Sequence, residues 1–377
     1  MTIITGTKSL TNTRLYTLDA LRGIAALVVV AFHYSNFFTV GNVLPPSFEA
    51  SNLPFYLILR DVYKVGWLAV DLFFTLSGFV FFWLYADKIA KREITSQDFW
   101  LLRFSRLYPL HLLTLLIVVC GQWLISLGNA HFFVYPNNDL KQFIMQLCFV
   151  SAWGGDINSF NGPVWSVSIE VAVYGLFFLL CRFFRIRIVI LLAVAVIGLW
   201  IVFRFHNFMG RGIGSFFIGG AVYIVYTYLT RLNSARVTFL LFSVMVGLWA
   251  FWIVALHTDW AFLSSYLHKR IPRYFPVVFL FPLTIVVLAM LEPYIGNLKK
   301  RLAILGDISY SLYLLHFPLQ LSVAVIVSAI GVPLNIMYSS VAFILFFAVL
   351  IPLAYFCYHY FERPCQQWIR SKSHARI

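Results

Sequence analysis

Residues 18–34 have the sequence LDALRGIAALVVVAFHY, an apolar run that is interrupted by Asp19, Arg22 and His33. A helix that crosses a bilayer needs about 20 predominantly apolar residues, and this run, extended to residue 40, is long enough. Ionisable side chains inside such a run are costly in lipid and usually mark function. The stretch therefore predicts a membrane-spanning helix that carries part of a polar site.

The whole chain has the same character. Of its 377 residues, 61% are hydrophobic and only 11% are charged, whereas a soluble domain carries about 25% charged residues. Ten runs meet the length criterion: 18–40, 65–86, 109–128, 163–182, 187–204, 212–230, 237–257, 274–291, 307–330 and 336–360. The stretch 141–152 is too short to span and is expected to be a re-entrant or interfacial piece. We expect an all-α fold, a polytopic transmembrane helical bundle.

The position of the basic residues predicts the orientation. A net charge of +14 could indicate nucleic-acid binding, but the lysines and arginines lie between the apolar runs. With both termini placed in the cytoplasm, most of them fall on the cytoplasmic side, as the positive-inside rule requires. No small-residue cleavage site follows the first apolar run, so we expect an uncleaved signal-anchor. The predicted organisation is a cytoplasmic segment 1–17, a ten-span membrane domain 18–364 and a cytoplasmic basic tail 365–377, with no nucleic-acid partner.

The first span places Arg22 and His33 on one helical face. They are eleven residues apart, close to three turns, or roughly 16 Å along the axis. Asp19 lies three residues before Arg22 and can pair with it. The alternative is structural, with Arg22 extending to the headgroups and His33 bonded to a carbonyl.

Polar residues also form a stripe at helical spacing on three other spans. The stripes are Asp71, Thr75 and Gly78; Ser166, Glu170 and Tyr174; and Ser309, Tyr313, His316 and Gln320. Each stripe alone could be interhelical hydrogen bonding. The titratable members and His33 fall at neighbouring depths in the predicted spans, which favours one interior site.

A second cluster precedes the third span on the cytoplasmic side. The segment FWLLRFSRLYP places Arg103 and Arg106 on one helical face, and guanidinium groups bind phosphate in bidentate fashion. The alternative is ordinary positive-inside charge with an aromatic belt.

Six motifs together resemble the acyltransferase-3 family of membrane O-acyltransferases. They are LDALRGIAALVVVAFHY, GWLAVDLFFTLSGF, LLRFSRLYP, VWSVSIE, ISYSLYLLHFP and FERP, and they run in the order of that family from residue 18 to 364. The resemblance implies ten core spans and transfer of an acyl group, often acetyl, from acyl-CoA to sugar hydroxyls of cell-surface polysaccharides, lipo-oligosaccharides or antibiotics. Some members of the family carry an extra extracytoplasmic hydrolase-like domain, and here the sequence ends about a dozen residues after FERP, so we expect any such module to be a separate partner or unnecessary.

The resemblance and the polar stripes together give a set of site residues. His33 is the expected general base, Glu170 or Asp71 would orient it, and Arg22 would steady the donor. Arg103 and Arg106 are expected to bind the donor phosphates. Ser309, Tyr313 and His316 complete the predicted donor site. An acyl-histidine intermediate is an alternative mechanism.

The expected co-substrate is acyl-CoA, most simply acetyl-CoA, with no permanently bound cofactor and no metal. The expected partners are a glycan or lipid-linked glycan acceptor and the membrane, here a bacterial inner membrane crossed many times. The main rival is a proton-coupled secondary transporter, in which the ionisable groups form a relay. A lipid-linked glycosyltransferase and a scaffold without chemistry are further rivals.

Overall fold

A computed structural model of the chain describes residues 14–128, 131–154, 157–257 and 274–372. Within these ranges the chain is helical, and its only extended pairing is a pair of isolated bridges from Val40 to Val43 and Phe133. The predicted all-α fold is confirmed. Residues 1–13 of the predicted N-terminal segment and 373–377 of the predicted tail lie outside the described residues.

Nine helical stretches of the described chain are long and apolar enough to cross a membrane. They are Tyr16–Phe38, Tyr56–Leu84, Ser96–Gly128, Gly162–Phe183, Ile188–Phe205, Phe208–Arg231, Ala235–His257, Ser309–Ala329 and Ser340–Ser371. The predicted span 274–291 coincides with a shorter apolar helix, Pro276–Leu291. Large apolar side chains such as Leu240 and Val341 are 64% exposed, as expected where helices face lipid. The chain is therefore a multi-pass membrane protein.

The chain divides into two compact units. The first comprises the described parts of Met1–Ala25, Leu68–Ile94 and Ala172–Gly306, and the second Ala26–Trp67, Thr95–Val171 and the described part of Asp307–Ile377. The first contains the start of α1 (Tyr16–Phe32), α3 (Ala69–Leu84), α4 (Ala86–Ala90), the end of α7 (Trp165–Phe183), α8 (Ile188–Phe205), α9 (Phe208–Arg231), α10 (Ala235–His257), α13 (Phe281–Leu291) and α14 (Leu298–Asp307). The second contains the end of α1, α2 (Tyr56–Val65), α5 (Ser96–Gly128), α6 (Leu140–Leu147), the start of α7, α15 (Ser309–Ala329), α16 (Ser340–Cys357) and α17 (Arg363–Ser371).

In the first unit, α3 and α9 pack backbone against backbone. A Cβ atom on Gly78 would lie 1.9 Å from the carbonyl oxygen of Phe216, and one on Gly219 would lie 2.0 Å from that of Thr75. Small residues at helix contacts allow this approach in membrane proteins, where van der Waals packing replaces the hydrophobic effect. Gly78, a member of the second-span stripe, therefore serves packing.

In the second unit, α15 is the central helix. The hydroxyl of Tyr310 on α15 donates to the carbonyl of Leu107 on α5 (2.6 Å). Further along α15, Leu321 packs against Gly121 of α5. Pro318 lies inside α15 and has no N–H for the carbonyl of Leu314, four residues before it. The buried amide of Asn161 donates to that carbonyl instead (3.5 Å).

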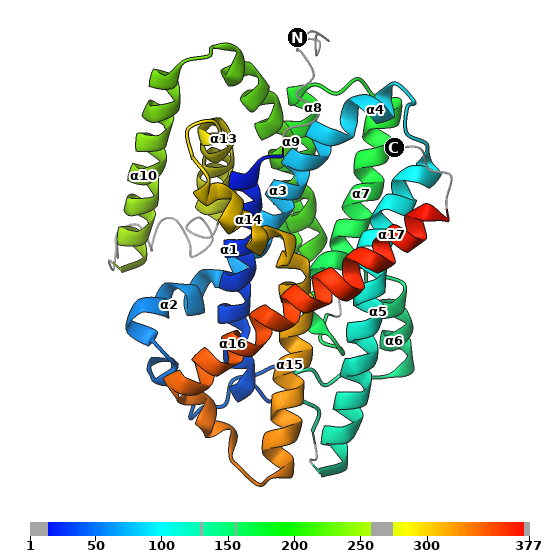
Figure 1. The fold of residues 1–377 in the computed structure, drawn as a ribbon, viewed down its shortest axis with the longest axis vertical. Coiled ribbons are helices and arrows are strands. Elements are labelled where there is room, and N and C mark those ends of the chain that lie inside the picture. The colour runs from blue at the N-terminus through cyan, green and yellow to red at the C-terminus, as the bar shows by residue number, and fades with distance from the viewer. Residues whose placement is uncertain (1–13, 129–130, 155–156, 258–273, 373–377) are drawn as a thin grey trace. The chain divides into compact units, whose positions relative to one another are not determined.

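Two predicted boundaries differ from the structure. The third span, expected to begin at residue 109, belongs to a helix that begins at Ser96 and continues through Pro109. Proline removes one hydrogen bond but does not end this helix, since packing against α15 holds both sides of it. The last span continues through a π-helical segment, Tyr358–Glu362, into α17, which crosses α5 in Figure 1.

Candidate functional site

Two histidines from different helices meet inside the second unit. His33 lies where α1 gives way to a 3-10 turn, His33–Phe38, and His316 lies in the middle of α15. Their rings stack with centroids 5.1 Å apart and planes inclined by 24°. The sequence placed both histidines at neighbouring depths, and the structure brings them into contact.

The hydrogen bonds of His316 fix its tautomer. Its ring is fully buried, and its Nδ1 lies 2.6 Å from the carbonyl oxygen of Tyr313. A carbonyl only accepts, so Nδ1 carries the proton and Nε2 presents a lone pair. Neither this Nε2 nor the Nδ1 of His33 has a hydrogen-bond partner among the described residues. Buried polar atoms are nearly always bonded, so these two nitrogens indicate room for a polar ligand or water.

The backbone of His33 is anchored by the helix that carries His316. Gln320 donates from Nε2 to the carbonyl of His33 (2.8 Å), and its Oε1 accepts from the amide of Asn36 (3.3 Å). Gln320 is fully buried. Gln320 therefore ties the backbone at His33 to the face of α15 that carries His316. This face is the polar stripe that the sequence predicted on α15.

One turn earlier on α15, Tyr313 is bonded to the turn that begins α7. Its hydroxyl donates to the carbonyl of Pro163 (2.7 Å) and lies 2.8 Å from the hydroxyl of Ser166. Glu170 is one turn further along α7, so the Ser166 stripe faces the α15 stripe at this level. Tyr313 therefore joins two helices, and its predicted contact with the donor stays a prediction.

The predicted phosphate-binding arginines lie near the N-terminal end of α15. Arg103 is buried and Arg106 half-buried, and both lie inside α5. Tyr310, bonded to Leu107, brings the start of α15 against this segment. Ser309, the third donor-site residue predicted on α15, is buried at its first position.

The FERP motif belongs to the same region. The carboxylate of Glu362 accepts a hydrogen bond from Ser311 (2.6 Å), and Glu362 is only 6% exposed. Three of the six motifs, LLRFSRLYP, ISYSLYLLHFP and FERP, therefore meet at one end of α15.

Arg22 and Asp71 lie in the first unit, where each has partners. Arg22 donates to the carbonyl of Gly306 (2.7 Å) and forms the predicted pair with Asp19 (3.2 Å). Asp71 forms an ion pair with Arg211 (2.6 Å) that the sequence analysis missed. The sequence signal for this pair was the position of Asp71 and Arg211, each near the start of an apolar helix. The predicted catalytic roles of Arg22 and Asp71 stay predictions.

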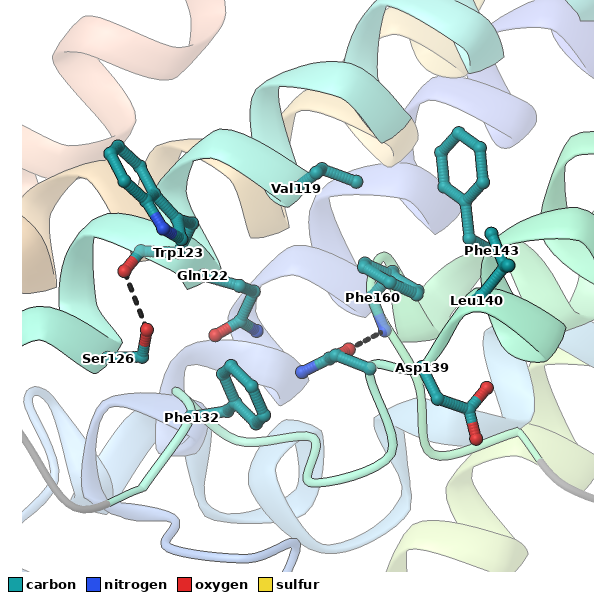
Figure 2. Close-up of a pocket in the computed structure, with 10 residues that line it drawn as sticks. Val119, Gln122, Trp123, Ser126, Phe132, Asp139, Leu140, Phe143 and Phe160 are labelled. Carbon is teal, nitrogen blue, oxygen red and sulfur yellow. Dashed lines mark hydrogen bonds between the residues drawn. The ribbon is translucent and has the colours of Figure 1, made fainter.

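An open groove of about 340 Å³ lies elsewhere on the second unit, between α5 and the segment 132–160 (Figure 2). Aromatic side chains, among them Trp123, Phe132 and Phe143, line much of it. Its lining amide, Gln122, bonds both the N–H and the carbonyl of Phe133 (2.9 Å each). The Gln122 side chain thus secures the loop at Phe133, and none of the predicted site residues lines the groove.

The described residues hold no group of three His, Cys, Asp or Glu side chains arranged to bind a metal ion. The chemical groups that the second unit brings together are instead imidazoles, hydroxyls, a nearby carboxylate and guanidinium groups. This combination suits proton transfer beside an anionic ligand.

Comparison with known proteins decides the family. The family model described as "Acyltransferase domain" (Acyl_transf_3) matches residues 15–359. The chain belongs to the acyltransferase-3 family. The resemblance drawn from the six motifs is confirmed.

Two curated relatives of this chain match over part of their lengths. "Acyltransferase MdmB" of Streptomyces mycarofaciens is 35% identical over 176 residues, 46% of this chain and 40% of that protein. "Protein 2 in picA locus" of Rhizobium radiobacter is 38% identical over 105 residues, 28% of this chain and 44% of that protein. The matched region thus spans less than half the length of either relative. No solved structure matches.

Proposed function

We propose that this acyltransferase moves an acyl group, most simply acetyl, from acyl-CoA to a hydroxyl of a cell-surface glycan or lipid-linked glycan, in a bacterial inner membrane. The observation that carries the proposal is the stacked pair of His33 and His316, whose two unpartnered nitrogens lie inside the unit that also holds Arg103 and Arg106.

The spacing along α15 suits a long, phosphate-bearing donor. His316 lies six residues after Tyr310, which contacts the arginine segment, so the two levels are about 9 Å apart along the axis. The pantetheine arm of CoA contains roughly four residue-sized units, which extend to about 14 Å at ~3.5 Å each. A donor with its phosphates at Arg103 and Arg106 can therefore present its thioester at the histidines.

The reaction at this level follows ordinary acyl-transfer chemistry. The imidazole of His33 accepts the proton of the acceptor hydroxyl while the oxygen attacks the thioester carbonyl carbon. The new C–O bond forms, the C–S bond breaks, and the leaving thiolate takes the proton back from the imidazolium. The tautomer-fixed ring of His316 packs against His33 and holds it in place.

Glu170 is the acidic side chain of the second unit that suits the imidazolium. It lies one turn after Ser166, whose hydroxyl is bonded to Tyr313, three residues before His316. A carboxylate near a protonated imidazole stabilises it and orients its ring. We assign Glu170 this orienting role.

Acyl transfer by the purified protein in nanodiscs tests the proposal. Acetyl-CoA labelled in the acetyl group is supplied with a glycolipid extract, and both free thiol and labelled glycan are measured. We expect both products, and Arg103→Ala should raise the donor concentration for half-maximal rate about ten- to a hundredfold, because one charged phosphate contact contributes roughly 1.5–3 kcal/mol. A transporter would release no thiol and leave the mass of the acceptor unchanged, and an unchanged donor dependence would leave Arg103 with a topological role alone.

A further inference from the structure

The groove between α5 and the segment 132–160 suits an apolar ligand (Figure 2). The amide, hydroxyl and carboxylate side chains that line it are each bonded to the backbone around them: Gln122 to Phe133, Ser126 to Trp123, Asn138 to Tyr135 and Phe160, and Asp139 to Gln142. These bonds hold the walls together and use the groups that would orient a polar ligand such as a sugar. A hydrocarbon chain needs no such partners, so the lining fits a chain better than a glycan.

The groove opens onto a lipid-facing surface of α5. This helix is long and apolar enough to cross a membrane, and Trp123 at the groove is 62% exposed. Leu124 and Leu127 follow on the same helix outside the lining, and both are exposed. At the inner end, Phe160 is buried and packs against Phe143 with ring centroids 6.0 Å apart. A chain from the bilayer can therefore enter past Trp123 and end against Phe160.

The groove and the predicted phosphate site lie on opposite sides of the histidine level. Near the start of α15, Tyr310 contacts the arginine segment of α5. Further along, Leu321 packs against Gly121, which precedes the groove residue Gln122. His316 lies six residues after Tyr310 and five before Leu321, or about 9 and 8 Å along the axis. A donor at the arginines and a ligand in the groove thus approach the histidines from opposite directions.

One segment forms a wall of the groove and also packs beside the histidine pair. Phe132 lines the groove. The next residue, Phe133, packs with Phe317, which follows the histidine of α15, with ring centroids 5.9 Å apart. Phe133 also packs with Phe37 (6.4 Å), which belongs to the 3-10 turn that begins at His33. The groove therefore shares a wall with the site of the proposed reaction.

We propose that this groove binds the hydrocarbon chain of a lipid-linked glycan, the acceptor, and thereby presents a sugar hydroxyl to His33. The inference rests on the proposed function and narrows its acceptor to the lipid-linked class. It commits to the acceptor because a chain bound here carries its headgroup beside the histidines, on the side that the donor leaves open. The phospholipids of the membrane have chains of similar chemistry, and the experiments below separate the two.

Transfer by the full-length protein in phosphatidylcholine nanodiscs is measured with two acceptors, the glycolipid extract and the same glycans released from their lipid. Val119→Trp fills the groove from α5. Its kcat/KM for the lipid-linked acceptor should fall about tenfold relative to its kcat/KM for the released glycan, the loss expected when about two methylene groups leave an apolar site. The matched control Leu124→Trp places the same side chain on α5 outside the groove, and it should keep the ratio of the natural chain.

Two further measurements separate ligand binding from folding. Trp123→Ala removes an exposed side chain at the mouth and should lower the same ratio severalfold even if Val119→Trp does not fold. Photolabelling gives a readout that does not depend on transfer. A polyprenyl phosphate with a diazirine in its chain should label peptides of α5 and of the segment 132–160 in the natural chain, and should label them less in Val119→Trp.

Each remaining outcome is decisive. Equal losses with the two acceptors would give the groove residues a structural role and overturn the inference. A ratio like that of the natural chain in both Val119→Trp and Trp123→Ala would also overturn it, and the proposed function would still stand. Equal labelling by a diazirine-tagged phosphatidylglycerol would assign the groove to ordinary membrane lipid and overturn the inference. If acetyl-CoA releases no thiol with either acceptor, the proposed function itself fails, and the inference fails with it.

Discussion

Replacing Asp71 by leucine should destabilise the protein by about 3–5 kcal/mol, the usual result of removing one partner from a buried ion pair. Arg211 holds the carboxylate in two places, at 2.6 and 3.3 Å, and Ser215 donates to it as well (3.3 Å). The two charged side chains are only 4% and 12% exposed. The single variant therefore leaves a guanidinium without its counter-ion in a space that water hardly reaches.

The double variant Asp71→Leu/Arg211→Met should be far less destabilised than the single variants suggest. Apolar groups of similar volume replace a buried pair at little cost, often within about 1 kcal/mol. The free energies of unfolding, measured in mixed detergent for the four members of this cycle, should give a coupling of about 5 kcal/mol or more, since each single loss is about 3–5 kcal/mol and the double loss about 1 kcal/mol. Single variants that lose under 1 kcal/mol, or losses that simply add, would refute the reasoning. Acyl transfer by the stable double variant then decides the predicted catalytic role of Asp71, because loss of transfer in a folded protein would support that role.

Two further substitutions test the packing and the hydroxyl network. Gly78→Val should unfold the protein at a markedly lower temperature, because a Cβ there meets the carbonyl of Phe216 at 1.9 Å; a thermal melt checks this against Gly247→Ala, whose added Cβ has no neighbour within 4 Å and should leave the melting temperature unchanged or raised. Tyr313→Phe should cost about 1–2 kcal/mol through its lost hydrogen bonds and slow transfer, and a higher donor concentration for half-maximal rate would support its predicted place in the donor site. If Ser166→Ala adds its full effect to Tyr313→Phe in stability measurements, the two hydroxyls do not act as one network.

Helical spacing predicted the face of α15 correctly. Tyr313, His316 and Gln320 follow one another at intervals of three and four residues, and their side chains make contacts to α7 and to the start of the turn at His33. The spans could also be predicted, because an apolar run of sufficient length has no other stable structure in lipid. These features are local, and a sequence carries them directly.

Pairings between distant segments could not be predicted in the same way. The partners Asp71 and Arg211, and Arg370 and Ser105, are set by which helices pack together, and periodicity carries no information on that. Asn161 was missed for a related reason. Its use is to occupy the carbonyl that Pro318 leaves open, which becomes visible only when the turn before α7 is placed beside α15.

In the proposed reaction the imidazole of His33, stacked on His316, accepts the proton of the acceptor hydroxyl. The most direct measurement is the rate of acyl transfer by His33→Gln in nanodiscs, alongside its CoA affinity and its melting temperature. We expect a rate lower by about 10²–10⁴-fold, the usual contribution of a general base, with CoA affinity and stability close to those of the natural chain. Transfer at a near-normal rate by this folded, CoA-binding variant would contradict it.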